Sequence, residues 1–193
     1  MRCTLTALTL LATTAAQAET TQRTVTYPVH GRTGIALYRS IGENGPKIGG
    51  RRTIAHTGFD LTWTRDYRVQ PDGACRLAVA RPHLVVTTTV PKAPADLPPA
   101  LAASWSRFAE GIRTHERVHA RAIAAMVARI EAFSTGLTAP ADPDCTRVRQ
   151  KLQAFLAKTI ARHRAESRAF DKADIAEEGG TMRQTILDLV NGP

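Results

Sequence analysis

Residues 99–134 read PALAASWSRFAEGIRTHERVHARAIAAMVARIEAFS, and the expected architecture is built around this segment. Apolar side chains recur in it at intervals of three and four residues, from Leu101 through Ile112 to Phe133. That spacing places them on one face of an α-helix. The charged residues fall on the rest of the helix surface: Glu110, Arg113, Arg117, Arg121 and Arg129. The sequence therefore predicts one long amphipathic helix from about Pro99 to Ser134.

A second helix follows after a break at Gly136, Pro140 and Pro143. One face of it carries Val148, Leu152, Phe155, Thr159, His163, Ser167 and Phe170. Gly179-Gly180 ends this segment, and a short helix around Met182 to Val190 is expected to close the chain. The two long helices are predicted to form an antiparallel hairpin.

The chain before Pro91 has the alternation and the turns of β-strands. Strands are predicted at Thr24–Val29, Phe59–Thr64 and from Cys75 to Val90, with a short helix over Ile35–Ile41. These pieces fit a small antiparallel sheet of three or four strands. The expected fold class is α+β, a small antiparallel sheet followed by a long antiparallel helical hairpin, with residues 19–91 mainly β and 99–193 mainly α.

The N-terminus reads as a secretory signal peptide over residues 1–18. Arg2 precedes a short apolar run, and Ala16-Gln17-Ala18 forms an A-x-A cleavage site. The run is too short to span a membrane, and no later stretch is long enough. Cleavage near Ala18 would export a single domain, residues 19–193, to the periplasm or the medium.

Composition and cysteine content agree with an exported globular protein. The 193 residues are 43% hydrophobic and 22% charged, an ordinary globular mix. Removal of the signal peptide leaves Cys75 and Cys145, which predicts one disulfide in an oxidising compartment. The formal net charge of +9 allows weak contact with anionic envelope components. No aromatic platform accompanies the basic residues, so nucleic-acid binding is not expected.

The first long helix contains His115-Glu116-Arg117-Val118-His119, an H-E-x-x-H motif. On a helix the two histidines share one face and can hold one metal ion. Glu116 is rotated by about 100° from His115, which places it beside the metal as a general base. Both histidines lie on the apolar stripe, where a metal would satisfy both imidazoles. The motif predicts a Zn²⁺ site.

A catalytic zinc ion needs a third protein ligand. Ala122 and Ala125 occupy the positions where a metzincin has its glycine and third histidine. In an antiparallel hairpin, His163 comes within about one turn of the height of His119. A slip of the register by one turn would bring a carboxylate there instead: Glu166, Asp171 or Asp174.

The chain resembles a bacterial family of unknown function described as predicted secreted zinc-dependent proteases. The resemblance rests on the H-E-x-x-H motif and on the order of Tyr27, Gly31, Gly45-Pro46, Trp63, Cys75, Pro91, Trp105, Cys145 and Phe170-Asp171. It implies a zincin-like metallopeptidase domain. Where the family has a threonine and a His-Gly pair after the aromatic-Asp pair, this chain has Asp174 and Ala176-Glu177. The third ligand therefore remains either His163 or Asp171.

These observations lead to two hypotheses. The first is an exported zinc-dependent metallopeptidase that acts on a peptide or protein substrate, with Glu116 as general base. The alternative is a non-catalytic envelope-binding or structural protein with a structural or relic metal site. Retention of Glu116 favours catalysis, because a structural site has no use for a base beside the metal.

Overall fold

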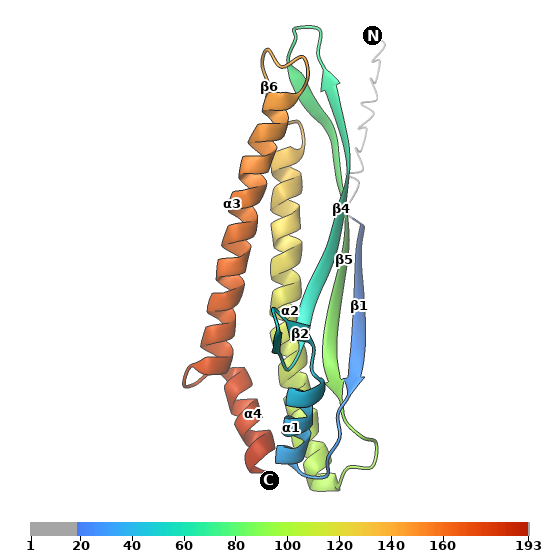
Figure 1. Ribbon diagram of the computed structural model, residues 1–193, viewed down its shortest axis with the longest axis vertical. Coiled ribbons are helices and arrows are strands. Elements are labelled where there is room, and N and C mark those ends of the chain that lie inside the picture. Colours follow the sequence, from blue (N-terminus) through green and yellow to red (C-terminus); the bar gives the residue numbers. More distant parts are fainter. Residues whose placement is uncertain (1–18, 193) are drawn as a thin grey trace, which may run out of the picture.

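A computed structural model describes residues 19–192 (Figure 1). The elements along the chain are β1 (Glu19–Pro28), α1 (Gly34–Asn44), β2 (Lys47–Ile48), β3 (Arg51–Arg52), β4 (His56–Val69), β5 (Cys75–Lys92), α2 (Pro99–Ser134), β6 (Thr138–Ala139), α3 (Thr146–Asp171), the π-helix η1 (Lys172–Ala176) and α4 (Thr181–Asn191). The predicted signal peptide and its cleavage site at Ala18 lie outside the described residues. Within residues 19–192, no helix combines the length and the apolar character that crossing a membrane requires.

The fold is mixed α and β, as predicted, but the sheet is not wholly antiparallel. β5 lies at the centre, with β4 antiparallel to it on one edge and β1 parallel to it on the other. Two reversals of direction separate β1 from β5, because the chain turns back into β4 and turns again into β5 (Figure 1). An even number of reversals leaves two strands parallel. The prediction of an antiparallel sheet was therefore wrong for β1.

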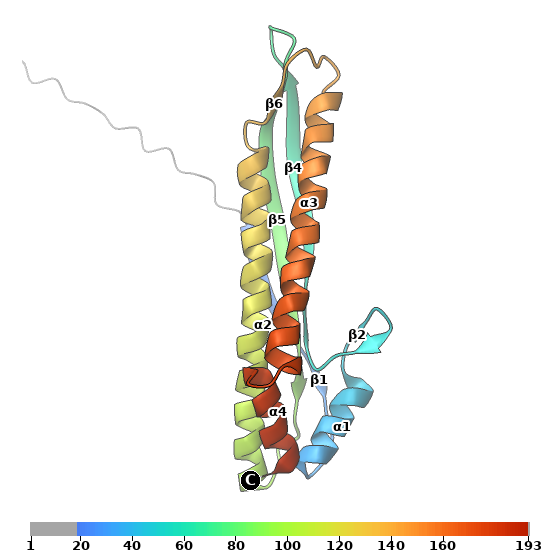
Figure 2. The same cartoon turned by 90° about the vertical axis from the view of Figure 1, so that its left-hand side faces the viewer.

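Two long helices cover one face of the sheet (Figures 1 and 2). α2 begins and ends at the residues that its apolar spacing predicted. Leu84 and Val86 of β5 pack against the buried apolar face of α2. The part of β4 from Thr57 to Trp63 turns every second residue toward the helices, as the alternation of a strand requires. The outcome is a two-layer molecule with its core between sheet and helices.

The predicted disulfide between Cys75 and Cys145 is present, with a Cα–Cα distance of 5.2 Å. It joins the start of β5 to the start of α3. Ala139 and Val148 pack around it in a small buried cluster. One end of the helical hairpin is thereby attached covalently to the sheet.

At its C-terminal end, α3 continues into two further helical segments. The helix passes at Asp171 into η1, a single π-helical turn, and α4 then packs back against α2 and α1. The bounds of α4 agree with the short helix predicted around Met182 to Val190. Gly180 permits the close approach of α4 to η1, because a Cβ there would lie 2.3 Å from the carbonyl oxygen of Asp174. This turn brings two aspartates close to the H-E-x-x-H motif.

Candidate metal centre

The two histidines of the motif lie one turn apart on the face of α2 that meets the end of α3. The His115 side chain is 6% exposed and that of His119 13% exposed. Their Nε2 atoms are 3.1 Å apart, and the rings meet edge to face. Phe170 covers them, with its ring 4.7 Å from that of His115 and 5.4 Å from that of His119. The helix geometry and this aromatic cover fix both imidazoles in place.

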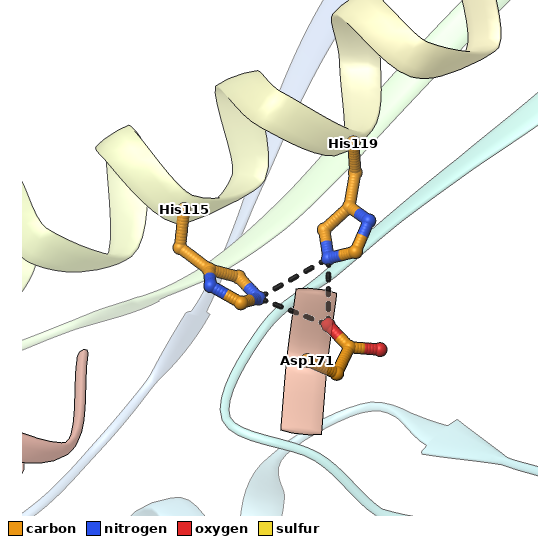
Figure 3. Close-up of side chains that lie close together, drawn as sticks. All are labelled: His115, His119 and Asp171. Carbon is orange, nitrogen blue, oxygen red and sulfur yellow. Dashed lines mark hydrogen bonds and ion pairs between the residues drawn. The ribbon is translucent and has the colours of Figure 1, made fainter. Parts of the chain in front are cut away.

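Asp171, the last residue of α3, completes a cluster of three (Figure 3). Its Oδ1 atom lies 2.8 Å from His119 Nε2 and 3.2 Å from His115 Nε2. Zinc binds nitrogen and oxygen ligands at about 2.0–2.2 Å in a tetrahedron, which sets the ligand atoms about 3.3 Å apart. The three contacts lie close to that spacing, so the donor set and its dimensions fit a zinc ion.

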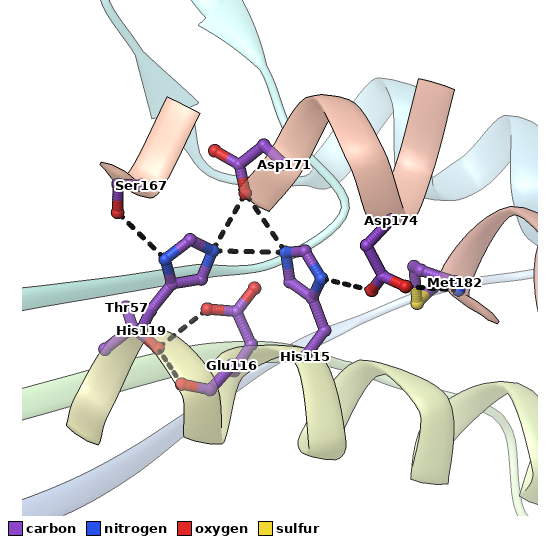
Figure 4. Close-up of polar contacts among 8 residues, drawn as sticks. All are labelled: Thr57, His115, Glu116, His119, Ser167, Asp171, Asp174 and Met182. Carbon is purple, nitrogen blue, oxygen red and sulfur yellow. Dashed lines mark hydrogen bonds and ion pairs between the residues drawn. The ribbon is translucent and has the colours of Figure 1, made fainter. Parts of the chain in front are cut away.

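Each histidine makes a second hydrogen bond through its other ring nitrogen (Figure 4). His115 Nδ1 lies 2.8 Å from Asp174 Oδ2, and His119 Nδ1 lies 3.0 Å from Ser167 Oγ. Asp174 is itself held by the backbone N–H of Met182, at the start of α4, which donates to Oδ1. Partners of this kind fix the ring orientation and the tautomer of metal-binding histidines.

These outer bonds determine which atoms face the centre of the cluster. An ionised carboxylate only accepts hydrogen bonds, so the N–H group at His115 Nδ1 donates a hydrogen bond to Asp174. The Nε2 atom of the neutral His115 ring then carries a lone pair that points at Asp171 and at His119. That lone pair and the Asp171 carboxylate are both acceptors, so a proton or a cation must lie between them. The chemistry of the donor set therefore favours a bound cation.

The electrostatics favour positive charge within the cluster, carried by a proton when no metal is bound. Burial alone would lower the pKa of His115, but its hydrogen bonds to Asp171 and Asp174 outweigh burial and raise that pKa. Burial would raise the pKa of Asp171, yet the hydrogen bonds from His115 and His119 hold it far below its ordinary value. Asp171 therefore stays ionised and offers a full negative charge to a cation.

The Glu116 side chain contacts the sheet. Its carboxylate is only 5% exposed and accepts a hydrogen bond of 2.7 Å from Thr57 Oγ1, on β4. Thr57 in turn contacts the hydroxyl of Thr88 on β5 at 3.0 Å. Figure 4 shows the Glu116 side chain rising from α2 between those of His115 and His119. The sheet thus orients the carboxylate beside the three-residue cluster.

A cavity of about 790 Å³ opens over this arrangement. His115, Glu116, His119 and Asp171 all line it. The rest of its wall includes the β2–β3 hairpin and the segment after it, the end of α3, η1 and the start of α4, with side chains such as Ile48, Arg51, Arg168 and Ile175. The cluster is therefore reachable by a ligand larger than water.

Four residues were considered as the third metal ligand: His163, Glu166, Asp171 and Asp174. The structure places them differently. Asp171 joins the histidines, and Asp174 hydrogen-bonds to the outer side of His115. His163 lies outside the cluster, where its ring packs edge-on against Phe59 at 6.5 Å. Burial and the charge of His119 lower the pKa of His163. Glu166 is exposed and pairs with Arg162 at 2.6 Å.

Sequence reasoning missed Thr57 and Ser167 as parts of this site. Ser167 had a usable signal, since it lies on the inward stripe of α3 one helical turn before Asp171. Thr57 had none, because nothing in a strand sequence indicates which threonine will face a glutamate 59 residues later.

Comparison with known families gives one match. Residues 24–179 match the family described as "Bacterial protein of unknown function (DUF922)". This agrees with the resemblance to a bacterial family of unknown function, and the description assigns no activity. Neither the curated proteins nor the solved structures contain a significant match.

Proposed function

The chain belongs to the DUF922 family of bacterial proteins of unknown function, and we propose that it is a zinc-dependent metallopeptidase. One observation carries the proposal. Three ligand atoms at zinc spacing and a buried glutamate lie on one wall of a single open cavity. A structural zinc site is closed by four protein ligands, whereas a catalytic site has three and one open position.

His115, His119 and Asp171 would hold the ion. When bound, zinc supplies Lewis acidity, which polarises a carbonyl group and lowers the pKa of water to about 7. The remaining chemistry belongs to side chains of this chain. Asp174 and Ser167 hold the two imidazoles with their Nε2 atoms turned inward. The ionised Asp171 offsets part of the charge of the cation.

Glu116 is the general base of the proposed reaction. Its Oε2 atom is held by the Thr57 hydroxyl, which leaves Oε1 to take a proton from an attacking water. The same carboxyl group can pass that proton to the leaving nitrogen of a cleaved peptide bond. Thr57 acts as a positioning residue, because it fixes the carboxylate without touching the reacting atoms.

The zincin-like fold, the export and the peptide substrate are parts of this proposal. The disulfide agrees with an oxidising compartment. The cavity carries both apolar and basic side chains, which suits a peptide with apolar and acidic groups.

The variant Glu116→Gln tests the catalytic role. It keeps the size of the side chain and removes the base. We expect it to bind about one zinc per chain, as the wild type does, and to lose at least about 100-fold in hydrolysis of a casein or mixed-peptide substrate. Equal hydrolysis by both proteins would overturn the role of Glu116. Zinc binding without hydrolysis in either protein would favour the non-catalytic alternative.

A further inference from the structure

A second pocket of about 550 Å³ lies at the end of the molecule opposite the metal centre. Its lining residues are Trp63, Arg65, Tyr67, Arg149 and Gln153. Arg149 and Asp171 lie at opposite ends of α3, about 33 Å apart along the helix axis. The two pockets share no lining residue, so the second pocket is separate from the proposed peptidase site.

Two structural elements bring these side chains together by simple periodicity. The three residues from β4 alternate along the strand and share one face of it. Arg149 and Gln153 are four residues apart on α3 and also share a face. The aromatic side chains belong to the core, since Trp63 packs against the central cluster and Tyr67 against the disulfide cluster. The pocket therefore has rigid walls.

Each guanidinium group lies over one of these aromatic rings. Arg65 Cζ lies 5.1 Å from the centre of the Trp63 ring, and Arg149 Cζ lies 4.1 Å from the centre of the Tyr67 ring. A cation–π contact of this kind attracts the guanidinium to the ring face and leaves other N–H groups available for contact with an oxyanion. Both arginines are thus oriented before any ligand arrives.

The protein supplies no counter-ion to either arginine within the described chain. No acidic residue lines the pocket, and neither guanidinium forms a hydrogen bond or an ion pair with residues 19–192. The Nε atom of Arg65 is buried without any hydrogen-bond partner. The terminal nitrogens of Arg65 and the guanidinium of Arg149 are therefore the groups that can meet a ligand.

We propose that this pocket binds a phosphate group. Two fixed positive charges match the charge of about −1.5 to −2 that a phosphomonoester carries at pH 7. Two guanidinium forks and the Gln153 amide supply the donors that several phosphate oxygens need. A free phosphate ion and a phosphate ester of a small molecule both present this chemistry.

Titration calorimetry on the mature protein tests the proposal with two probes, inorganic phosphate and glycerol 3-phosphate. We expect saturable binding of at least one probe, weakened at least about tenfold by Arg149→Ala. Arg149→Lys should also weaken it, because lysine keeps the charge but loses the planar fork. Tighter binding of glycerol 3-phosphate would identify an esterified phosphate, and equal binding would identify the ion itself.

Arg23→Ala is the matched control, because it removes the same charge from the distant edge strand β1. We expect it to change binding by less than about twofold. Arg149 is exposed, so its variants should fold, and circular dichroism would verify this. The proposal is overturned if neither probe binds at about 10 mM, or if Arg23→Ala weakens binding as much as Arg149→Ala does. Binding that survives Arg149→Ala would overturn it too, since the anion would then occupy another site such as the metal centre.

Discussion

The two ends of the α2–α3 hairpin are held together by different kinds of interaction. Where α3 begins, a disulfide joins Cys145 to Cys75 within a small buried cluster. Where α3 ends, Asp171 meets His115 and His119 through polar contacts, and the ring of Phe170 packs on both imidazoles. The first end is joined covalently, whereas the second brings together acceptor atoms that a cation would satisfy.

This difference suggests that the two ends have different tasks. The disulfide attaches the hairpin to the sheet whether or not a metal is bound. With the disulfide contributing to the stability of the fold, the end that carries Asp171 can have an open cavity and an ionised aspartate. Variants at the two ends should consequently change different measured quantities.

The largest effect is expected at the disulfide end. Cys75→Ser combined with Cys145→Ser opens a covalent loop whose ends are 70 residues apart in sequence. Loop-closure entropy predicts a loss of about 4 kcal/mol in the free energy of unfolding. Urea denaturation followed by circular dichroism measures this loss. The zinc content of the folded double variant should stay near that of the wild type, and a parallel loss of zinc would show that the two ends are not independent.

His115→Ala should have the next largest effect, this time on metal binding. Removal of one ligand costs roughly a quarter of the zinc-binding free energy, or about 3 kcal/mol. We therefore expect zinc affinity to fall at least about 100-fold, measured by competition with a coloured chelator. His163→Ala is the matched control and should bind zinc as the wild type does. Loss of zinc in that control would return His163 to the ligand set.

Asp174→Asn tests the support behind the first histidine. The amide keeps the shape of the side chain but can no longer hold the His115 ring as a carboxylate does. Changes to such outer partners typically weaken metal binding 10- to 100-fold. Asp188→Asn makes the same chemical change at an exposed position of α4 and should leave zinc affinity unaltered. Equal affinities in the two variants would remove Asp174 from the site.

Thr57→Val should give the smallest effect, and only on turnover. Valine has the shape of threonine but cannot donate a hydrogen bond to Glu116. The carboxylate therefore loses the roughly 1 kcal/mol of hydrogen-bond free energy that orients it. We expect kcat to fall about five- to tenfold while zinc content and KM stay the same. An unchanged kcat would show that the carboxylate needs no support from the sheet.

Much of the fold was predictable because its signals are local. The bounds of α2 follow from apolar residues that repeat every three to four positions within one element. The disulfide followed from the presence of only two cysteines after the predicted signal peptide. The parallel pairing of β1 with β5 was missed, because strand direction depends on how the intervening chain turns back.

The metal centre likewise combines features that local sequence predicts with features that depend on tertiary packing. The sequence alone places His115 and His119 on one helix face with Glu116 beside them, because four residues make about one helical turn. That Asp171 meets them, and His163 does not, depends on tertiary packing. That choice depends on the register between two helices, where a slip of one turn moves a side chain by about 5.4 Å. Register is set by packing against the sheet and by the π-helical turn after Asp171, and neither follows from the local sequence pattern.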